Sequence, residues 1–208
     1  MNFAEAFQIQ KGITAIVGSG GKTSLLCRLA SELTGRVLVC TTTHMFSPEQ
    51  FPFATRAEEW EGVLCIGTPT DSGKITAPAQ SFEELETMAD YILVEADGSK
   101  RLPLKAHAAH EPVIPPNCQK IITVVGASGL NRPIVETVHR PERFLTLTGS
   151  EIATPEAVAS ALLAEHLGDH IFIHQADTHR AEALALAAHL PKPLWIGSVR
   201  KGEIECLY

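Results

Sequence analysis

A glycine-rich segment suited to holding a phosphate group lies near the start of the chain. Its residues are Gly18, Ser19, Gly20, Gly21, Lys22, Thr23 and Ser24. Glycines let a backbone curl so that several N–H groups converge on one anion, and a following helix adds the positive end of its dipole. Lys22 would reach the outer phosphates of a nucleotide, and the Thr23 hydroxyl would ligate Mg²⁺. The spacing is G-x-x-G-K-T-S, two residues shorter than the common phosphate-loop pattern, whose first glycine would fall on Ile16.

Two carboxylates follow an apolar run, residues 91–95, that is typical of a buried strand. Glu95 ends the run and Asp97 lies two positions later, so both side chains point the same way if the strand continues. We expect Glu95 to hold the metal with Thr23, and Asp97 to orient an attacking water or to form, with Gly98, a loop that responds to the γ-phosphate. The alternative is that one carboxylate only caps a turn.

Three further polar residues follow other apolar runs. Thr42 and Thr43 come after residues 36–41, and their hydroxyls would either contact a substrate or simply end a strand. Asp177 follows residues 170–174, at the point where GTPases carry the aspartate that accepts hydrogen bonds from guanine. Asp177 could equally be the N-cap of the next helix, so the choice between ATP and GTP stays open.

The densest basic stretch of the chain, residues 99–111, follows Asp97 directly. It would neutralise an anionic substrate or the transferred phosphate, or change shape with nucleotide state. The residues that we select from it are Lys100, Arg101, Lys105 and His110. A metal site made by His107, His110 and Glu111 is an alternative, although histidines at this spacing are more often packing or surface residues. Residues 139–143 form another charged turn, for which we expect a solvated or partner-facing position.

Expected strands and helices alternate along the chain. Apolar runs predict strands at 12–17, 36–41, 91–95, 120–126, 170–174 and 194–198, the last paired with 203–207. Helical spacing and capping residues predict helices from the loop to Gly35, at 82–88 after Ser81, at 155–167 after Thr154, and at 178–190. Runs at 63–67 and 74–78 flank a polar turn and predict a small β-hairpin inserted at about residues 62–78.

This order predicts the fold class α/β, with a three-layer phosphate-loop domain and a mostly parallel sheet, as one domain over residues 1–208. Ligands of such sheets sit at the carboxyl ends of the strands. The candidate residues named above would therefore gather at one edge.

The composition narrows the class of protein further. The chain has 208 residues and 45% hydrophobic content, and it has neither an apolar tract that could span a membrane nor a secretory signal, so we expect a cytoplasmic protein that does not bind membranes. A net charge of −7 argues against a general nucleic-acid binder. The five cysteines are scattered and form no C-x-x-C pair, which argues against a disulfide scaffold or a structural zinc site.

Several motifs together resemble the YqeC family, whose members are described as accessory factors for selenium-dependent molybdenum hydroxylases. The motifs are G-S-G-G-K-T-S at 18–24, T-T-T-H-M at 41–45, V-E-A-D-G-S-K at 94–100, L-K-A at 104–106, H-E-P-V-I-P at 110–115 and V-H-R-P-E at 138–142. The resemblance covers about residues 10 to 180. His44 stands where family members often have lysine, so a lysine role there does not carry over. The resemblance implies a phosphate-loop NTPase whose partner is a selenium-dependent molybdenum hydroxylase or its maturation factors.

These observations favour a protein that binds ATP or GTP with Mg²⁺ and hydrolyses it, with Lys22, Glu95 and Asp97 as the catalytic residues. Two alternatives stay open. The loop and the threonine run are similar to those of Mur-type ligases, and the V-E-x-x-G pattern is similar to dethiobiotin synthetase, which favours a ligase or kinase acting on a small acid. The second alternative is a scaffold that binds nucleotide without turnover.

Overall fold

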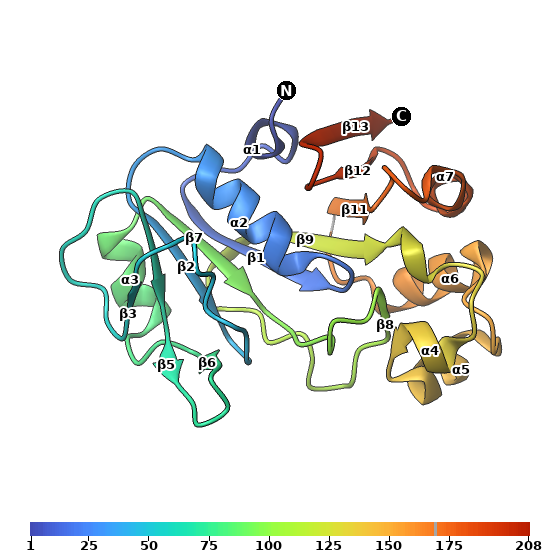
Figure 1. Cartoon of the computed structure of the whole chain (residues 1–208), viewed down its shortest axis with the longest axis horizontal. Helices are drawn as coiled ribbons and strands as arrows, with labels where there is room; N and C mark the ends of the chain where they lie inside the picture. Colours follow the sequence, from blue (N-terminus) through green and yellow to red (C-terminus); the bar gives the residue numbers. More distant parts are fainter. Residues whose placement is uncertain (169) are drawn as a thin grey trace. The chain divides into compact units, whose positions relative to one another are not determined.

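The computed structural model describes residues 1–168 and 170–208, and these divide into two compact units. Unit 1 comprises residues 1–16, 23–98 and 113–121, and unit 2 comprises residues 17–22, 99–112 and 122–208. Strands β1 (Gly12–Gly18) and β9 (Cys118–Gly126) contribute to both (Figure 1). The expectation of a single domain over residues 1–208 stays a prediction.

Unit 1 is built on parallel strands. β1 pairs with β7 (Tyr91–Glu95), β7 with β2 (Val37–Thr41), β2 with β4 (Val63–Ile66), and β4 with β3 (Phe53–Ala54). The other elements of this unit are α1 (Phe3–Ala6), α2 (Lys22–Glu32), which begins at the last residue of the loop in unit 2, α3 (Phe82–Met88), β5 (Thr68–Pro69) and β6 (Ile75–Thr76). Every residue of β2 is buried, as expected for a parallel strand between other strands.

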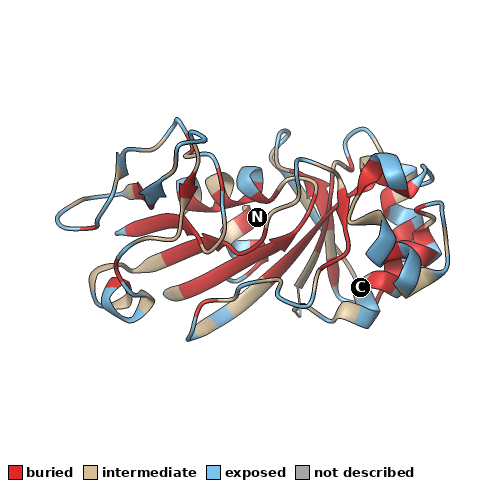
Figure 2. Cartoon of the chain, turned by 90° about the horizontal axis from the view of Figure 1, so that it is seen from below, coloured by how far each residue is buried: buried red, intermediate tan, exposed pale blue. Residues whose placement is uncertain are grey.

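Both faces of this sheet are covered. Leu85 of α3 belongs to one apolar cluster with Leu38 and Ile92 on the sheet. Successive residues of a strand point to opposite faces, and Val37 and Val39 are also fully buried, so the second face is covered as well. Figure 2 shows the buried strands in red. Because both faces of the sheet are covered, these strands appear in the sequence as continuous apolar runs.

Unit 2 combines a smaller set of strands with most of the helices. β9, β11 (His170–His174) and β12 (Leu194–Ser198) are parallel, and β13 (Glu203–Leu207) is antiparallel to β12. A separate two-strand pair joins β8 (Leu104–Lys105) to β10 (Val138–His139). The helices are the 3-10 turn η1 (Ala127–Gly129), α4 (Ile134–Thr137), α5 (Pro141–Thr148), α6 (Pro155–Glu165) and α7 (Arg180–Ala187). The predicted α/β class with a mostly parallel sheet is therefore confirmed.

Local signals set most element boundaries. The Ser81 hydroxyl accepts a hydrogen bond from Glu84 N at 3.2 Å and the Thr154 hydroxyl accepts one from Ala157 N at 3.2 Å, so α3 and α6 begin where their caps predict. Helix α6 ends earlier than predicted, because His166 adopts a left-handed conformation with φ of 43°. In the described part of the chain, no helix is long and apolar enough to cross a membrane.

The hairpin insertion exists, but its first arm differs from the prediction. β5 pairs antiparallel with β6, around a turn at residues 70–74. The run at 63–66 is instead β4, a parallel strand of the main sheet. The apolar pattern could not separate the two, because β4 and the hairpin are one residue apart in sequence.

Candidate functional site

Within unit 2, the phosphate loop packs so closely against β9 and β11 that three of its positions accept only glycine. Gly18, Gly20 and Gly21 have φ of +90°, +81° and +134°, values that side chains disfavour. A Cβ at these positions would lie, respectively, 2.3 Å from Val124 O, 2.5 Å from Gly126 Cα and 2.2 Å from His174 Nδ1. The ends of β9 and β11 therefore lie directly against the loop, as the strand-end rule predicts.

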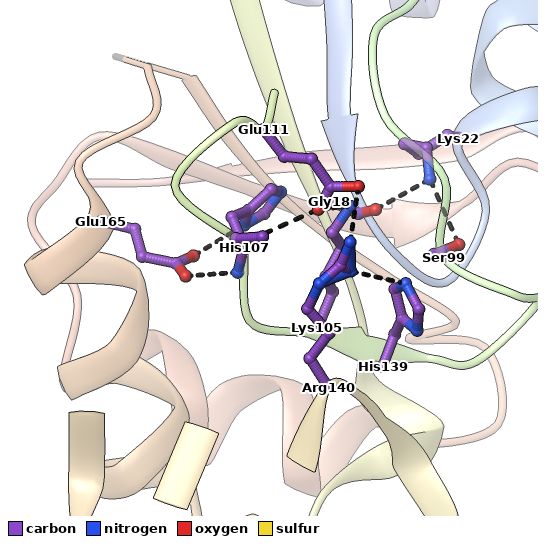
Figure 3. A network of polar contacts seen from close by, with 10 residues as sticks. Gly18, Lys22, Ser99, Lys105, His107, Glu111, His139, Arg140 and Glu165 are labelled. Carbon is purple, nitrogen blue, oxygen red and sulfur yellow. Dashed lines mark hydrogen bonds and ion pairs between the residues drawn. The ribbon is translucent and has the colours of Figure 1, made fainter. Parts of the chain in front are cut away.

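Hydrogen bonds fix the direction of the loop backbone. Ser19 N donates to Val124 O at 2.8 Å, and the Ser19 hydroxyl donates to Leu102 O. The Lys22 ammonium donates to Gly18 O at 2.8 Å and to the Ser99 hydroxyl at 3.2 Å (Figure 3). Lys22 is only 3% exposed, so its charge is held at the loop rather than in solvent.

Unit 1 brings together the two residues that we expect to hold the metal. The Thr23 hydroxyl donates to Glu95 Oε2 at 2.6 Å, and Glu95 is buried at the end of β7. Thr23 and Ser24 are exposed in the first turn of α2. Thr23 directly follows Lys22 in the sequence. A hydroxyl and a carboxylate are oxygen donors of the kind that Mg²⁺ prefers, so this pair fits the ion. Asp97, two residues after Glu95, is fully buried.

The threonines after β2 bind the backbone of their neighbours. The Thr41 hydroxyl donates to Glu95 O at 2.7 Å and accepts from Thr43 N at 3.0 Å. The Thr42 hydroxyl donates to Val113 O at 2.7 Å. These contacts fit the strand-end interpretation, and a substrate contact for Thr42 and Thr43 stays a prediction.

The basic stretch contains a cluster of charges around Glu111. Its carboxylate lies 3.0 Å from Lys105 Nζ and 3.1 Å from Arg140 (Figure 3). Burial raises the pKa of Glu111, but the hydrogen bond from Lys105 and the charges of Lys105 and Arg140 outweigh it, so the pKa is lowered. The Lys105 side chain has no exposed surface. Lys105 is thus an ion-pair partner in a buried position.

In the charged turn at residues 139–143, the first two residues are only partly exposed and bind neighbouring side chains, whereas residues 142 and 143 are exposed, in line with the expectation of a solvated or partner-facing position. The Arg140 side chain is 23% exposed, and its guanidinium donates to His139 Nε2 at 3.0 Å. Burial, followed by the charges of Arg140 and Lys105, lowers the pKa of His139, which keeps Nε2 available as an acceptor. Arg140 adopts φ of +68° just before α5, and the sequence gives no signal of that conformation.

The alternative metal site of His107, His110 and Glu111 is wrong. His107 N and Nδ1 contact the two oxygens of Glu165 on α6 at 2.6 and 2.7 Å (Figure 3). The Glu111 carboxylate is paired with the ammonium group of Lys105. Among the described residues, no group of three or more His, Cys, Asp or Glu side chains could hold a metal ion. His110, Lys100 and Arg101 are exposed, and their switch or substrate role stays a prediction.

Strand β11 delivers a contact to the loop that sequence reasoning missed. His174 Nδ1 lies 2.7 Å from Gly20 O. The only signal was that His174 ends a strand at the expected ligand edge. Asp177 is exposed in the following turn, whereas the N-cap of α7 is His179, so the capping alternative for Asp177 is wrong. A base contact by Asp177 stays a prediction.

The chain is similar to proteins of one known family. A family model described as YqeC protein matches residues 14–142. An Escherichia coli (strain K12) protein named "Uncharacterized protein YqeC" is 36% identical over 171 residues, which cover 70% of this chain and 62% of that relative. The match thus spans less than two thirds of the length of the relative. The family match includes the loop, both candidate carboxylates and the charge cluster around Glu111.

Replacing Glu111 by glutamine should destabilise the protein. The change leaves the charges of Lys105 and Arg140 close together without the carboxylate between them, and removing one partner of a buried ion pair costs about 3–5 kcal/mol. Because the folded-state pKa of Glu111 is lowered, its contribution is present above the ordinary value of 4.5 and is lost as pH falls through the lowered value. Urea unfolding at pH 7 should therefore show a much lower free energy of unfolding for the variant than for the parent. This difference between variant and parent should narrow below pH 4.5.

The control is Glu136→Gln, which removes the exposed Arg132–Glu136 pair, 3.0 Å apart. That change should alter the free energy of unfolding by less than about 1 kcal/mol. The role given to Glu111 would be contradicted if both variants lost the same free energy of unfolding. It would also be contradicted if the difference between Glu111→Gln and the parent did not depend on pH.

Proposed function

This chain belongs to the YqeC family, and on that premise we propose that it binds ATP or GTP with Mg²⁺ at residues 18–24 and hydrolyses the outer phosphate. The observation that carries the proposal is the fit of the loop against β9 and β11. Gly18, Gly20 and Gly21 have no space for a Cβ, and α2 begins directly after them, at Lys22. A tight glycine loop that leads into a helix favours convergent N–H groups and a positive helix end for an anion.

Lys22 would supply the positive charge for the outer phosphates. Its ammonium is held by the Gly18 carbonyl and the Ser99 hydroxyl, so little reorganisation is needed to place it. Burial strengthens the interaction of such a charge with an anion, because the surroundings screen it less than water does. The whole chain is acidic, with a net charge of −7, so this local charge matters for attracting a triphosphate.

Thr23 and Glu95 would hold Mg²⁺. Their side chains are already in contact at 2.6 Å, and the Thr41 hydroxyl fixes the backbone of Glu95 at 2.7 Å. When bound, Mg²⁺ supplies positive charge that neutralises the phosphate oxygens. Asp97 follows on the same segment and would orient the water that attacks the γ-phosphorus, so that the bond to the bridging oxygen breaks and inorganic phosphate leaves.

The biological role of the protein and the type of reaction that it catalyses stay predictions. The resemblance implies a role in maturing selenium-dependent molybdenum hydroxylases, and the relative in Escherichia coli is itself named uncharacterized. Phosphate release from ATP or GTP alone would support hydrolysis. Release only with an added small acid would support the ligase or kinase, and tight binding without release would support the scaffold.

Lys22→Ala should weaken the binding of triphosphate. The change removes the cation held at the loop, and a charge-assisted hydrogen bond contributes about 1.5–3 kcal/mol, or roughly 10- to 150-fold in affinity. Calorimetric titration with Mg·ATP and Mg·GTP measures the loss, and circular dichroism checks that the variant is folded. Lys201→Ala, which removes an exposed lysine before β13, is the matched control and should bind like the parent. Equal affinity of Lys22→Ala and parent would mean that the phosphate does not bind here.

Amide variants of the two carboxylates should fail in different ways. Glu95→Gln keeps the shape but removes the charge beside Thr23, so it should raise the Mg²⁺ concentration needed for half-maximal turnover. Asp97→Asn should lower turnover with little change in the Mg²⁺ requirement, because the lost interaction is made mainly in the transition state. Rates measured against Mg²⁺ concentration decide this. If both variants share the metal dependence of the parent, the assignment is wrong.

A further inference from the structure

His174 contacts the phosphate loop from the end of β11. Its Nδ1 lies 2.7 Å from Gly20 O, and the residue is 8% exposed. A carbonyl oxygen can only accept a hydrogen bond, so Nδ1 carries the proton and donates it. Burial lowers the pKa of His174, although the bond to Gly20 and the charge of Asp177 act in the opposite direction. The ring is therefore neutral at pH 7, and its one proton is the one given to Gly20.

This bond fixes the direction of the next N–H group of the loop. The peptide bond between Gly20 and Gly21 is trans, so its C=O and N–H point in opposite directions. With Gly20 O held toward His174, Gly21 N–H points away from the imidazole. The Gly18–Ser19 peptide, two peptides earlier, follows the same rule, because Gly18 O accepts from Lys22 while Ser19 N donates to Val124 O on the other side.

The imidazole also packs against the loop. A Cβ at Gly21 would lie 2.2 Å from His174 Nδ1, so the ring occupies the space that any side chain would need. The ring of Phe172, two residues earlier on β11, lies 5.6 Å from the His174 ring and supports its orientation. Packing and hydrogen bond together leave the Gly20 peptide little freedom to rotate.

We propose that His174 is a positioning residue of the phosphate site, whose Nδ1–H orients the Gly20 peptide so that Gly21 N–H faces the bound phosphate. The inference rests on the proposed function and adds a specific donor atom to it. A peptide N–H that is already oriented needs no reorganisation when the anion arrives. Rotating this peptide would instead turn the partial negative charge of the Gly20 carbonyl toward the phosphate.

Three substitutions separate the donor atom from simple packing. Asparagine places its amide nitrogen near the position of Nδ1, glutamine places its amide nearer the position of Nε2, and alanine removes both. One net hydrogen bond changes affinity by roughly 2- to 13-fold. We therefore expect His174→Ala and His174→Gln to bind Mg·ATP or Mg·GTP more weakly within that range, and His174→Asn to stay within about twofold of the parent.

The experiment is a calorimetric titration of the full chain and these variants, with a melting temperature for each. His170→Ala, at the other end of β11, is the control and should bind like the parent. If His174→Ala fails to fold, His174→Gln still tests the loss of the donor, because it fills most of the ring's space. A merely structural role would lower the melting temperature of all three variants without rescue by asparagine.

The outcomes distinguish this inference from the proposed function. If Lys22→Ala binds more weakly than the parent, but all three His174 variants bind with the affinity of the parent, the positioning role is overturned and the nucleotide site stands. Equal loss in the asparagine and glutamine variants overturns the role of the donor atom. If the parent binds neither nucleotide, the proposed function fails and this inference fails with it.

Discussion

The candidate site depends on one constraint, which is the absence of space beside the backbone of the loop. At Gly18, Gly20 and Gly21 a single added carbon would overlap β9 or β11. The same three residues have positive φ, so side chains are excluded by conformation as well as by contact. Because α2 starts at Lys22, any displacement of the loop would also move the lysine and the first turn of the helix. Packing of the backbone therefore sets the position of the chemistry.

Segment 99–112 of unit 2 is held both at the loop and at the helices. Near the loop, Ser99 accepts from Lys22, and Leu102 O accepts from Ser19. Farther along, a buried hydrogen bond between His107 and Glu165 ties the segment to α6, and the ion pair of Glu111 with Arg140 ties it to the residue before α5. Buried charges that are paired in this way contribute little net stability but are costly to separate, so they define one arrangement of the segment.

Signals that are local in sequence predicted much of the fold and part of the site. The loop was evident because its glycines, lysine and threonine are contiguous, and Glu95 because it ends an apolar strand. Ser81 and Thr154 gave the starts of two helices for the same reason. The α4 and α5 region was missed, since its helices are short and α5 follows a residue in a left-handed conformation.

Contacts between distant residues could not be predicted in this way. Glu165 is 58 positions from His107, and His174 is 154 positions from Gly20. A charged turn such as residues 139–143 resembles a solvated segment until the fold supplies Glu111 as the partner of Arg140. The capping alternative for Asp177 failed because the helix begins at Arg180, two residues later than its sequence pattern indicates.

The most direct test of the account is a titration of the unmodified chain with slowly hydrolysed analogues of ATP and GTP, with Mg²⁺ and again with a chelator. The account predicts saturable one-to-one binding of at least one analogue, weaker when Mg²⁺ is removed, because Thr23 and Glu95 bring oxygen ligands together beside Lys22 in the chain. Absence of binding by both analogues at millimolar concentration, with or without Mg²⁺, would contradict it.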